Sequence, residues 1–147
     1  MSPATNILIV EARFYADIAD ELVRGAHGVL DAAGATYDRA TVPGAFEIPA
    51  AIRIAHLGQE AAYDGYVALG CVIRGETSHY DYVCGESAHG LQSLALDHGL
   101  AIGYGILTVE DREQAWARAD VNQKNKGGDA AQACLAMISL RRRFGLD

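Results

Sequence analysis

Several features are scarce in this sequence of 147 residues, and each scarcity excludes a class of protein. Lys and Arg number 12 against 19 Asp and Glu, and the net charge of −7 argues against a general nucleic-acid-binding protein, which needs basic residues to replace the counterions of phosphates. No apolar run approaches the roughly 20 residues of a membrane-spanning helix. The three cysteines, Cys71, Cys84 and Cys134, form no CxxC motif. We therefore expect three small buried residues rather than a metal site or a disulfide framework.

A signal peptide and a high density of charge are also missing. Residues Met1–Asn6 lack the basic start and the apolar core of a signal peptide, so we expect a cytoplasmic protein. The length predicts a single domain over residues 1–147. Only 21% of the residues are charged, against about 25% in a typical domain. Because a small monomer has much surface for its volume, either a partner covers one face or the surface is unusually neutral.

What the sequence does contain is a regular alternation of two hydrophobic patterns. Continuously apolar runs such as Asn6–Ala12 and Gly65–Ile73 are typical of strands buried on both faces. Between such runs, apolar residues recur at spacings of three and four, which is typical of amphipathic helices. We expect strands at residues 6–12, 35–42, 65–73 and 100–108, and helices at 17–33, 45–57, 80–98, 111–119 and 129–144, with Thr108 or Asp111 as a candidate cap of the fourth helix.

Strand followed by helix, four times over, predicts an α/β fold: one three-layer α/β/α domain around a four-stranded parallel sheet. In open sheets of this kind, ligands bind at the carboxyl ends of the strands. We therefore expect the functional site among four segments, which are Glu11–Tyr15, Pro43–Pro49, Arg74–His79 and the turn after Tyr104.

The segment Ile73–His79 joins a buried strand to a long helix. N–H groups at a helix start favour an anion such as phosphate, and Gly75 lets backbone approach a ligand closely. Thr77 or Ser78 is placed to cap the helix or to bind a phosphate oxygen, although a cap without a ligand is the commoner arrangement. His79, at the same helix start, can transfer a proton near neutral pH; the alternative is a solvated residue.

Residues of the other segments suit a flat ligand. Phe46 and Glu47 lie in a loop fixed by two prolines and a glycine, where a ring could stack on a substrate and a carboxylate could bind its edge. Phe14 and Tyr104 lie near strand ends. The alternatives are a core role for the rings and, for Glu47, a place in a first helical turn, which the helix dipole favours.

A few basic residues complete the candidates. Lys124 and Lys126, in a stretch that contains glycines, could hold an anion together with Arg118, and a solvated turn is equally compatible with them. The sequence contains no GxSxG motif, no reactive Cys–His pair and no metal-binding triad. The residues on their own predict a cofactor-free site for a flat ring and a phosphate, with one histidine for proton transfer.

Three longer segments occur in a characteristic order: VPGAFEIP (Val42–Pro49), GCVIRGETSHYDYV (Gly70–Val83) and NKGGDAA (Asn125–Ala131). ARF (Ala12–Phe14) and YGILT (Tyr104–Thr108) fit the same pattern. With them, nearly the whole chain resembles the 6,7-dimethyl-8-ribityllumazine synthases of riboflavin biosynthesis. The resemblance implies a flavodoxin-like fold and a transferase that condenses 5-amino-6-(D-ribitylamino)uracil with 3,4-dihydroxy-2-butanone 4-phosphate. It implies imine formation, loss of phosphate and ring closure with loss of water, without a metal or organic cofactor.

The resemblance also implies roles for individual residues. Phe14 would stack on the pyrimidine ring and His79 would transfer protons. The pyrimidine and its ribityl chain would be bound by Ala45, Phe46, Glu47, Tyr104 and, mainly through backbone groups, Cys71, Val72 and Ile73. The phosphate substrate would be held by Glu76, Thr77, Arg118 and Lys126. In this family the site lies between adjacent subunits, and the neighbour would supply Tyr104, Arg118 and Lys126.

One segment departs from the family's pattern. Icosahedral members commonly carry a turn of the kind GTKAGNKG, whereas residues 120–127 of this chain are DVNQKNKG, without the two glycines that precede the asparagine. Such a turn is less free to adopt positive φ, which would change the angle of the following helix. With the short N-terminus, this predicts a homopentamer rather than a shell. The expected partners are two small-molecule substrates and further copies of the chain, with no nucleic acid and no membrane.

Functions of other classes remain open to the sequence. A non-catalytic carrier of flavin or lumazine could keep the aromatic pocket, with less need of His79, Arg118 and Lys126. A response-regulator-like domain would share the alternating pattern but needs an acidic cluster after the first strand, where this chain has only Glu11. An archaeal-type riboflavin synthase would share the fold. Formation of the lumazine from the two substrates discriminates among these.

Overall fold

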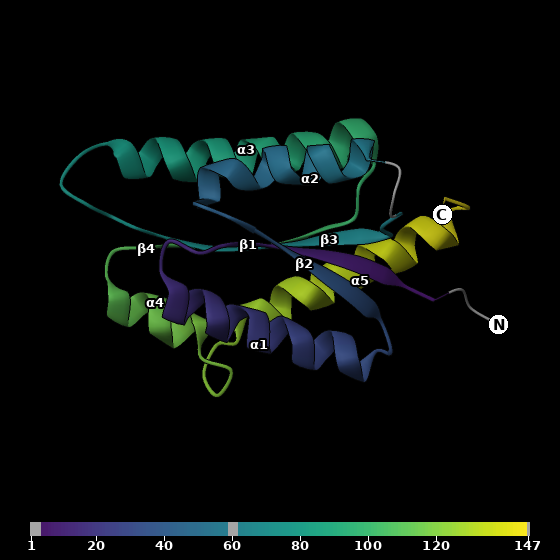
Figure 1. Ribbon diagram of the computed structural model, residues 1–147, viewed down its shortest axis with the longest axis horizontal. Coiled ribbons are helices and arrows are strands. Elements are labelled where there is room, and N and C mark those ends of the chain that lie inside the picture. Colours follow the sequence, from purple (N-terminus) through teal and green to yellow (C-terminus); the bar gives the residue numbers. More distant parts are fainter. Residues whose placement is uncertain (1–3, 59–61, 147) are drawn as a thin grey trace.

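Four parallel strands form the central sheet in the order β2-β1-β3-β4 (Figure 1). The computed structural model describes residues 4–58 and 62–146. The strands are β1 (Asn6–Ala12), β2 (Thr36–Val42), β3 (Gly65–Ile73) and β4 (Ile102–Val109). The helices are α1 (Ala16–Ala32), the 3₁₀ helix η1 (Ala45–Glu47), α2 (Ile48–Leu57), α3 (His79–His98), α4 (Arg112–Ala119) and α5 (Lys126–Arg143).

Helices cover both faces of the sheet, so the predicted three-layer α/β/α fold is confirmed. Helices α2 and α3 lie over one face, and α1, α4 and α5 lie over the other (Figure 1). Successive side chains of a strand point to opposite faces. Accordingly, Ile7 and Ile9 of β1 belong to the hydrophobic core on the α1 side, whereas Leu8 and Val10 belong to the core on the α2 side.

The predicted helix over residues 45–57 is divided in two by Pro49. A proline has no N–H, so residue 49 cannot donate the helical hydrogen bond to the carbonyl of residue 45. The N–H of Ile48 donates to the carbonyl of Ala45 instead, which gives the tighter 3₁₀ turn η1 before α2 begins. This division places Glu47 in a short separate turn at the end of β2 rather than in a long helix.

The ends of two other elements differ from the prediction. Strand β4 continues to Val109, so Tyr104 lies in the middle of the strand and the turn is at Glu110–Asp111. Helix α5 begins at Lys126 rather than at Asp129, so it includes Gly127 and Gly128, which precede the predicted helix. The remaining ends agree within two residues, and Asp111 caps α4 by accepting the N–H of Gln114.

The turn before α5 reaches positive φ at Asn125, the asparagine that follows the two missing glycines. Asn125 has φ 44°, and its side-chain oxygen accepts the N–H of Gly128 at 3.2 Å. Asparagine tolerates this left-handed conformation better than most residues, because its short side chain hydrogen-bonds locally. Asp120 and Lys124, which stand where the two glycines are missing, do not have positive φ, so the reduced freedom expected of this turn is not contradicted.

The cysteines are less uniform than predicted. Cys134 is buried, but Cys71 and Cys84 are only half-buried, and all three are free thiols. Over the described ranges 4–58 and 62–146, no helix is long and apolar enough to cross a lipid bilayer.

Candidate functional site

The carboxyl ends of β1, β2 and β3 meet at one edge of the sheet. Gly70 of β3 lies close to Ala12 at the end of β1 and to Ala45 in η1. A Cβ built on Gly70 would lie 3.3 Å from the Cβ of Ala12 and 3.7 Å from the Cβ of Ala45. Three segments distant in sequence therefore surround one small region, and most candidate residues belong to these segments or to the loop that follows β3.

Two aromatic rings project from this edge. Phe14, which follows β1, is 74% exposed, and Phe46 in η1 is 52% exposed. The Phe14 ring makes an edge contact with Tyr15, with 4.9 Å between ring centroids and 74° between planes. Large apolar rings exposed beside strand ends offer their faces to a flat ligand, whereas a core role for Phe14, the other interpretation of the sequence, is contradicted by its exposure.

Glu47 is held in a defined position at the same edge. Its Oε1 accepts the N–H of Gly44 at 3.1 Å, and its own N–H donates to the carbonyl of Gly44 at 3.2 Å. Together these reciprocal bonds close the 3₁₀ turn. The carboxylate is thus fixed and solvent-exposed, which suits hydrogen bonding to a ligand's edge.

The last three residues of β3, Cys71, Val72 and Ile73, are half-buried beside this region. Burial raises the pKa of the Cys71 thiol to about 12. Because a thiolate is the nucleophilic form of cysteine, Cys71 is not poised for covalent catalysis. Residues 71–73 can instead contribute their backbone N–H and C=O groups to ligand binding at the end of β3.

The loop between β3 and α3 carries exposed polar residues. Arg74 anchors its beginning through a 2.8 Å ion pair between Nε and Glu110 and a cation–π contact of 4.3 Å with Tyr80. Ser78 precedes α3 without making a side-chain cap; the hydroxyl of Thr77 accepts the N–H of His79 instead, at 3.3 Å. Glu76, Thr77 and His79 are all exposed. Each can therefore reach a ligand bound at the start of α3.

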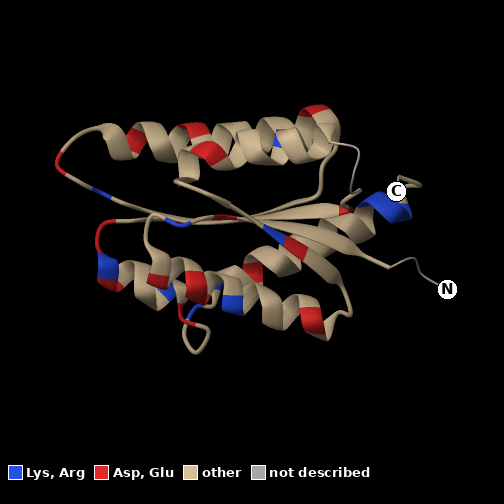
Figure 2. Cartoon of the chain, viewed as in Figure 1, with Lys and Arg blue, Asp and Glu red and all other residues tan. Residues whose placement is uncertain are grey.

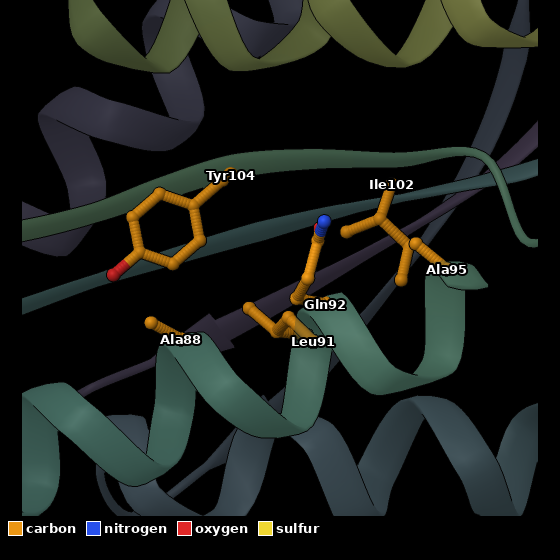
Figure 3. A pocket seen from close by; sticks show the side chains of 6 residues that line it. All are labelled: Ala88, Leu91, Gln92, Ala95, Ile102 and Tyr104. Carbon is orange, nitrogen blue, oxygen red and sulfur yellow. The ribbon is translucent and has the colours of Figure 1, made fainter. Parts of the chain in front are cut away.

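Three other predicted residues lie elsewhere. Tyr104 projects from β4 toward α3, and it lines a cavity of about 330 Å³ between these elements (Figure 3). Burial raises the pKa of the Tyr104 hydroxyl, although a hydrogen bond with Ser87 opposes that shift. Arg118 donates to the carbonyl of Gln114 within α4.

Lys126 forms an ion pair with Asp129 at 3.4 Å within the first turn of α5. Helices α4 and α5 cover the face of the sheet opposite α3 (Figure 1). Within one chain, Tyr104 therefore lies on one side of the sheet, whereas Arg118 and Lys126 belong to helices on the other.

The described part of the chain contains no group of three or more His, Cys, Asp or Glu residues that could hold a metal ion. A sequence model of the 6,7-dimethyl-8-ribityllumazine synthase family matches residues 4–142. This chain belongs to that family. A relative named 6,7-dimethyl-8-ribityllumazine synthase 1, from Rhizobium meliloti (strain 1021), is 60% identical over 145 residues, which cover 97% of this chain and 95% of the relative.

Two further relatives carry the name 6,7-dimethyl-8-ribityllumazine synthase. The protein from Bartonella henselae is 59% identical over 140 residues, covering 95% of this chain and 90% of its own length. The protein from Agrobacterium fabrum is 57% identical over 143 residues, covering 95% of this chain and 97% of its own length. The lumazine synthase family is therefore matched along almost the entire chain.

One cluster beside the site of this lumazine synthase family member is not evident from the sequence. Glu11 in β1 is completely buried and bonds to Arg39 of β2 and to Arg13. Burial raises the pKa of Glu11, but hydrogen bonds from Arg39 and Arg13 outweigh that effect, so its pKa lies below the usual 4.5. The sequence indicates this cluster only by placing a glutamate within an apolar strand. It does not identify Arg39 as the partner of Glu11, because that pairing depends on β2 lying next to β1.

Proposed function

We propose that this protein carries out its family's reaction at the sheet edge formed by β1, η1, β3 and the start of α3. That reaction condenses 5-amino-6-(D-ribitylamino)uracil with 3,4-dihydroxy-2-butanone 4-phosphate and gives 6,7-dimethyl-8-ribityllumazine, the penultimate step of riboflavin biosynthesis. The observation that carries this placement is that exposed rings, a fixed carboxylate and an exposed histidine all lie in segments that follow the carboxyl ends of parallel strands. The free thiols fit a reducing compartment, the cytoplasm.

The pyrimidine is proposed to bind against the rings of Phe14 and Phe46. Stacking uses the ring faces that the protein leaves in solvent, and burying them would stabilise the complex. Glu47 and the backbone at the end of β3 would hydrogen-bond the polar edge of the pyrimidine and its ribityl chain. Cys71 takes part through its backbone, because its neutral thiol has no nucleophilic role. Ala45, Val72 and Ile73 shape the same surface.

The phosphate substrate is proposed to bind at the start of α3. The helix dipole favours an anion there, Ser78 makes no side-chain cap, and Thr77 offers a hydroxyl at the same helix start. Glu76 borders the same position and would contact the hydroxyl groups of this substrate. His79 is exposed at the first position of α3, and we assign it the proton transfers that accompany imine formation and loss of phosphate.

Tyr104, Arg118 and Lys126 are proposed to act in the site of a neighbouring copy. Within one chain, these residues lie on elements away from the loop after β3, and Tyr104 stands at the open edge of the sheet next to a cavity (Figure 3). A second copy that brings its own Phe14 and η1 against this edge would complete the site. Two cationic side chains would then reach the phosphate that one chain alone binds only through α3 and its loop.

The surface of α3 supports such an assembly. Of its 20 residues, only Ser87, Leu91 and Leu94 are buried. Its sequence contains no Lys or Arg, and the helix is mostly uncoloured in Figure 2, which marks charged residues. An exposed helix with few charges is typical of a surface that another subunit covers. A head-to-tail contact whose rotation closes forms a ring, and we propose that this ring is the homopentamer expected from the sequence.

Complementation between two variants tests the shared site. His79→Ala impairs proton transfer on one side of the contact, and Arg118→Ala impairs phosphate binding on the other. When the two are co-expressed in equal amounts and assayed at low concentration of the phosphate substrate, random mixing should restore about a quarter of the sites. If each chain carried a complete site, every site would keep one defect and activity would stay at the level of the single variants.

Two simpler measurements test the rest of the proposal. Incubation of the wild-type protein with both substrates should produce the absorbance of the lumazine, and a folded protein that forms none refutes the proposed reaction. Sedimentation should give roughly 78 kDa, five times the chain mass of 15.6 kDa. A particle near a megadalton would refute the pentamer in favour of a shell.

A further inference from the structure

We propose that Glu11 is a positioning residue that fixes the ring of Phe14 for stacking, acting through the guanidinium of Arg13. This inference rests on the role in pyrimidine binding proposed above for Phe14. Glu11 does not contact the ligand surface itself, because its side chain is completely buried. Its effect on the site must therefore pass through the residues to which it bonds.

The carboxylate of Glu11 accepts hydrogen bonds with both of its oxygens. Oε2 accepts Nε of Arg39 at 2.7 Å, and Oε1 accepts Nη2 of the same guanidinium at 2.8 Å. Oε1 also accepts Nη1 of Arg13 at 2.8 Å. The two-point bond to Arg39 fixes the plane of the carboxylate, and this fixed carboxylate in turn sets the direction of the Arg13 side chain.

Arg13 connects this cluster to the end of β1. Its Nη1 also lies 2.8 Å from Asp20 of α1, and its backbone N–H donates to the carbonyl of Val42 at 3.1 Å. Both the main chain and the side chain of Arg13 are thus held at the point where the strand ends. The next residue is Phe14, whose ring is 74% exposed and makes an edge contact with the ring of Tyr15.

The residue on the other side of Phe14 is held as well. Tyr15 packs against the hydrophobic core, and the guanidinium of Arg112 lies 5.7 Å from its ring centroid. Phe14 therefore sits between two anchored residues. Fixing the backbone on both sides limits the directions in which the exposed ring can point, which reduces the conformational entropy lost when a ligand stacks on it.

Stability alone does not account for a carboxylate at this position. Ile7 and Ile9, which share the same face of β1, are apolar and completely buried. Replacing buried ion pairs by apolar residues is often neutral or stabilising, because charges taken from water lose hydration. The carboxylate of Glu11 instead orients the side chain of Arg13, and the fixed position of Arg13 in turn positions Phe14.

A double-mutant cycle between Glu11→Gln and Phe14→Ala tests the inference. The readout is the dissociation constant of 6,7-dimethyl-8-ribityllumazine, measured by fluorescence titration of the assembled protein. Glu11→Gln keeps the shape of the side chain and removes its charge. It should weaken binding roughly 3- to 10-fold, the range expected for loss of one aromatic contact, and should have no further effect once Phe14 is alanine. In steady state, KM for the pyrimidine should rise while KM for the phosphate substrate stays the same.

Asp31→Asn is the matched control. It removes a carboxylate of α1 that accepts a 2.9 Å hydrogen bond from Tyr37, near the start of β2 and away from the strand ends that form the site. It should leave lumazine binding unchanged. Arg13→Met is a second test of the inference, because it removes the guanidinium that connects Glu11 to Phe14 and leaves the Glu11–Arg39 pair intact. It should weaken lumazine binding to the same extent as Glu11→Gln.

Three results would overturn the inference. The first is unchanged lumazine binding in Glu11→Gln, and the second is that Glu11→Gln weakens binding as much in the Phe14→Ala protein as in the wild type. The third is unchanged binding in Arg13→Met. The first shows that the charge does not matter to the site, and the second that it acts through something other than the ring. Failure of the proposed function looks different, because the wild-type protein itself would then neither form nor bind the lumazine.

Discussion

Replacing Gly127 with alanine should separate the first turn of α5 from α1. Gly127 is buried in that turn, and a Cβ added to it would lie 2.0 Å from the carbonyl oxygen of Leu22 in α1. Ordinary contact begins at 3.4 Å, so the two helices would have to move apart by about 1.4 Å at this point. Overpacking typically costs about 1–3 kcal/mol, and we expect about 3 kcal/mol here because backbone atoms cannot rotate away.

The same displacement should impair phosphate binding. Lys126 is the residue before Gly127, so a shift of the first turn of α5 moves its side chain away from the position proposed for the phosphate of a neighbouring site. A misplacement of about 1 Å can cost as much as about 100-fold in rate. We expect KM for the phosphate substrate to rise at least several-fold, with KM for the pyrimidine unchanged because Phe14 and Phe46 lie on other elements.

Gly28→Ala is the matched control for this prediction. Gly28 is an exposed glycine of α1, and a Cβ added there meets nothing within 4 Å. Alanine at this position should stabilise the protein by about 0.5–1 kcal/mol, because it lowers the entropy lost on helix formation. Urea unfolding measures both effects; Gly127→Ala should lower the midpoint by roughly 1–2 M. Equal midpoints for the two variants would refute the close approach of α5 to α1.

Three further predictions concern single side chains. His79→Ala should slow turnover about 10²- to 10⁴-fold without abolishing it, and an unchanged kcat would contradict its role in proton transfer. Cys71→Ala should keep kcat/KM within about 3-fold, because the thiol, with its pKa raised to about 12, does not act as a nucleophile; a hundredfold loss would contradict this. Burial, aided by the charge of Arg39, lowers the pKa of His27 below 6.5, so its stabilising contribution is complete above pH 6.5 and is lost as pH falls through the lowered pKa. Thermal unfolding between pH 7 and pH 5 should show this dependence, and His27→Phe should reduce it.

The apolar patterns of the sequence predicted the sheet well, for a physical reason. Strand β3 was expected at residues 65–73 and is found there, since a strand buried on both faces must be apolar throughout. The start of α5 was not predicted, because Gly127 and Gly128 favour a loop when only their neighbours in sequence are considered. Gly127 lies within the helix because α5 approaches α1 so closely there that a residue with a Cβ would collide with Leu22. Local patterns do not contain that contact.

The candidate site likewise has one part that could be predicted from the sequence and one part that could not. Phe14, Phe46, Glu47 and His79 follow strand ends directly, so the rule that parallel sheets bind ligands at the carboxyl ends of their strands is sufficient to place them at one edge. The bond between Glu11 and Arg39 depends on β2 lying next to β1, and the alternating pattern does not determine which strands are neighbours. The roles proposed for Tyr104 and Arg118 require a second copy of the chain, which no pattern within one chain describes.

The exposed surface of α3 and the proposed sharing of the site between two copies lead to one further prediction. Tyr82 and Leu96 of α3 are 70% and 73% exposed, and exposed rings and aliphatic side chains on a helix with few charges favour association. The same helix begins with His79, so a copy that covers α3 also approaches the proposed catalytic histidine. Association and catalysis should therefore be lost together. On dilution, activity per chain should fall at the concentration at which sedimentation detects dissociation, and full activity of the separated chain would contradict the shared site.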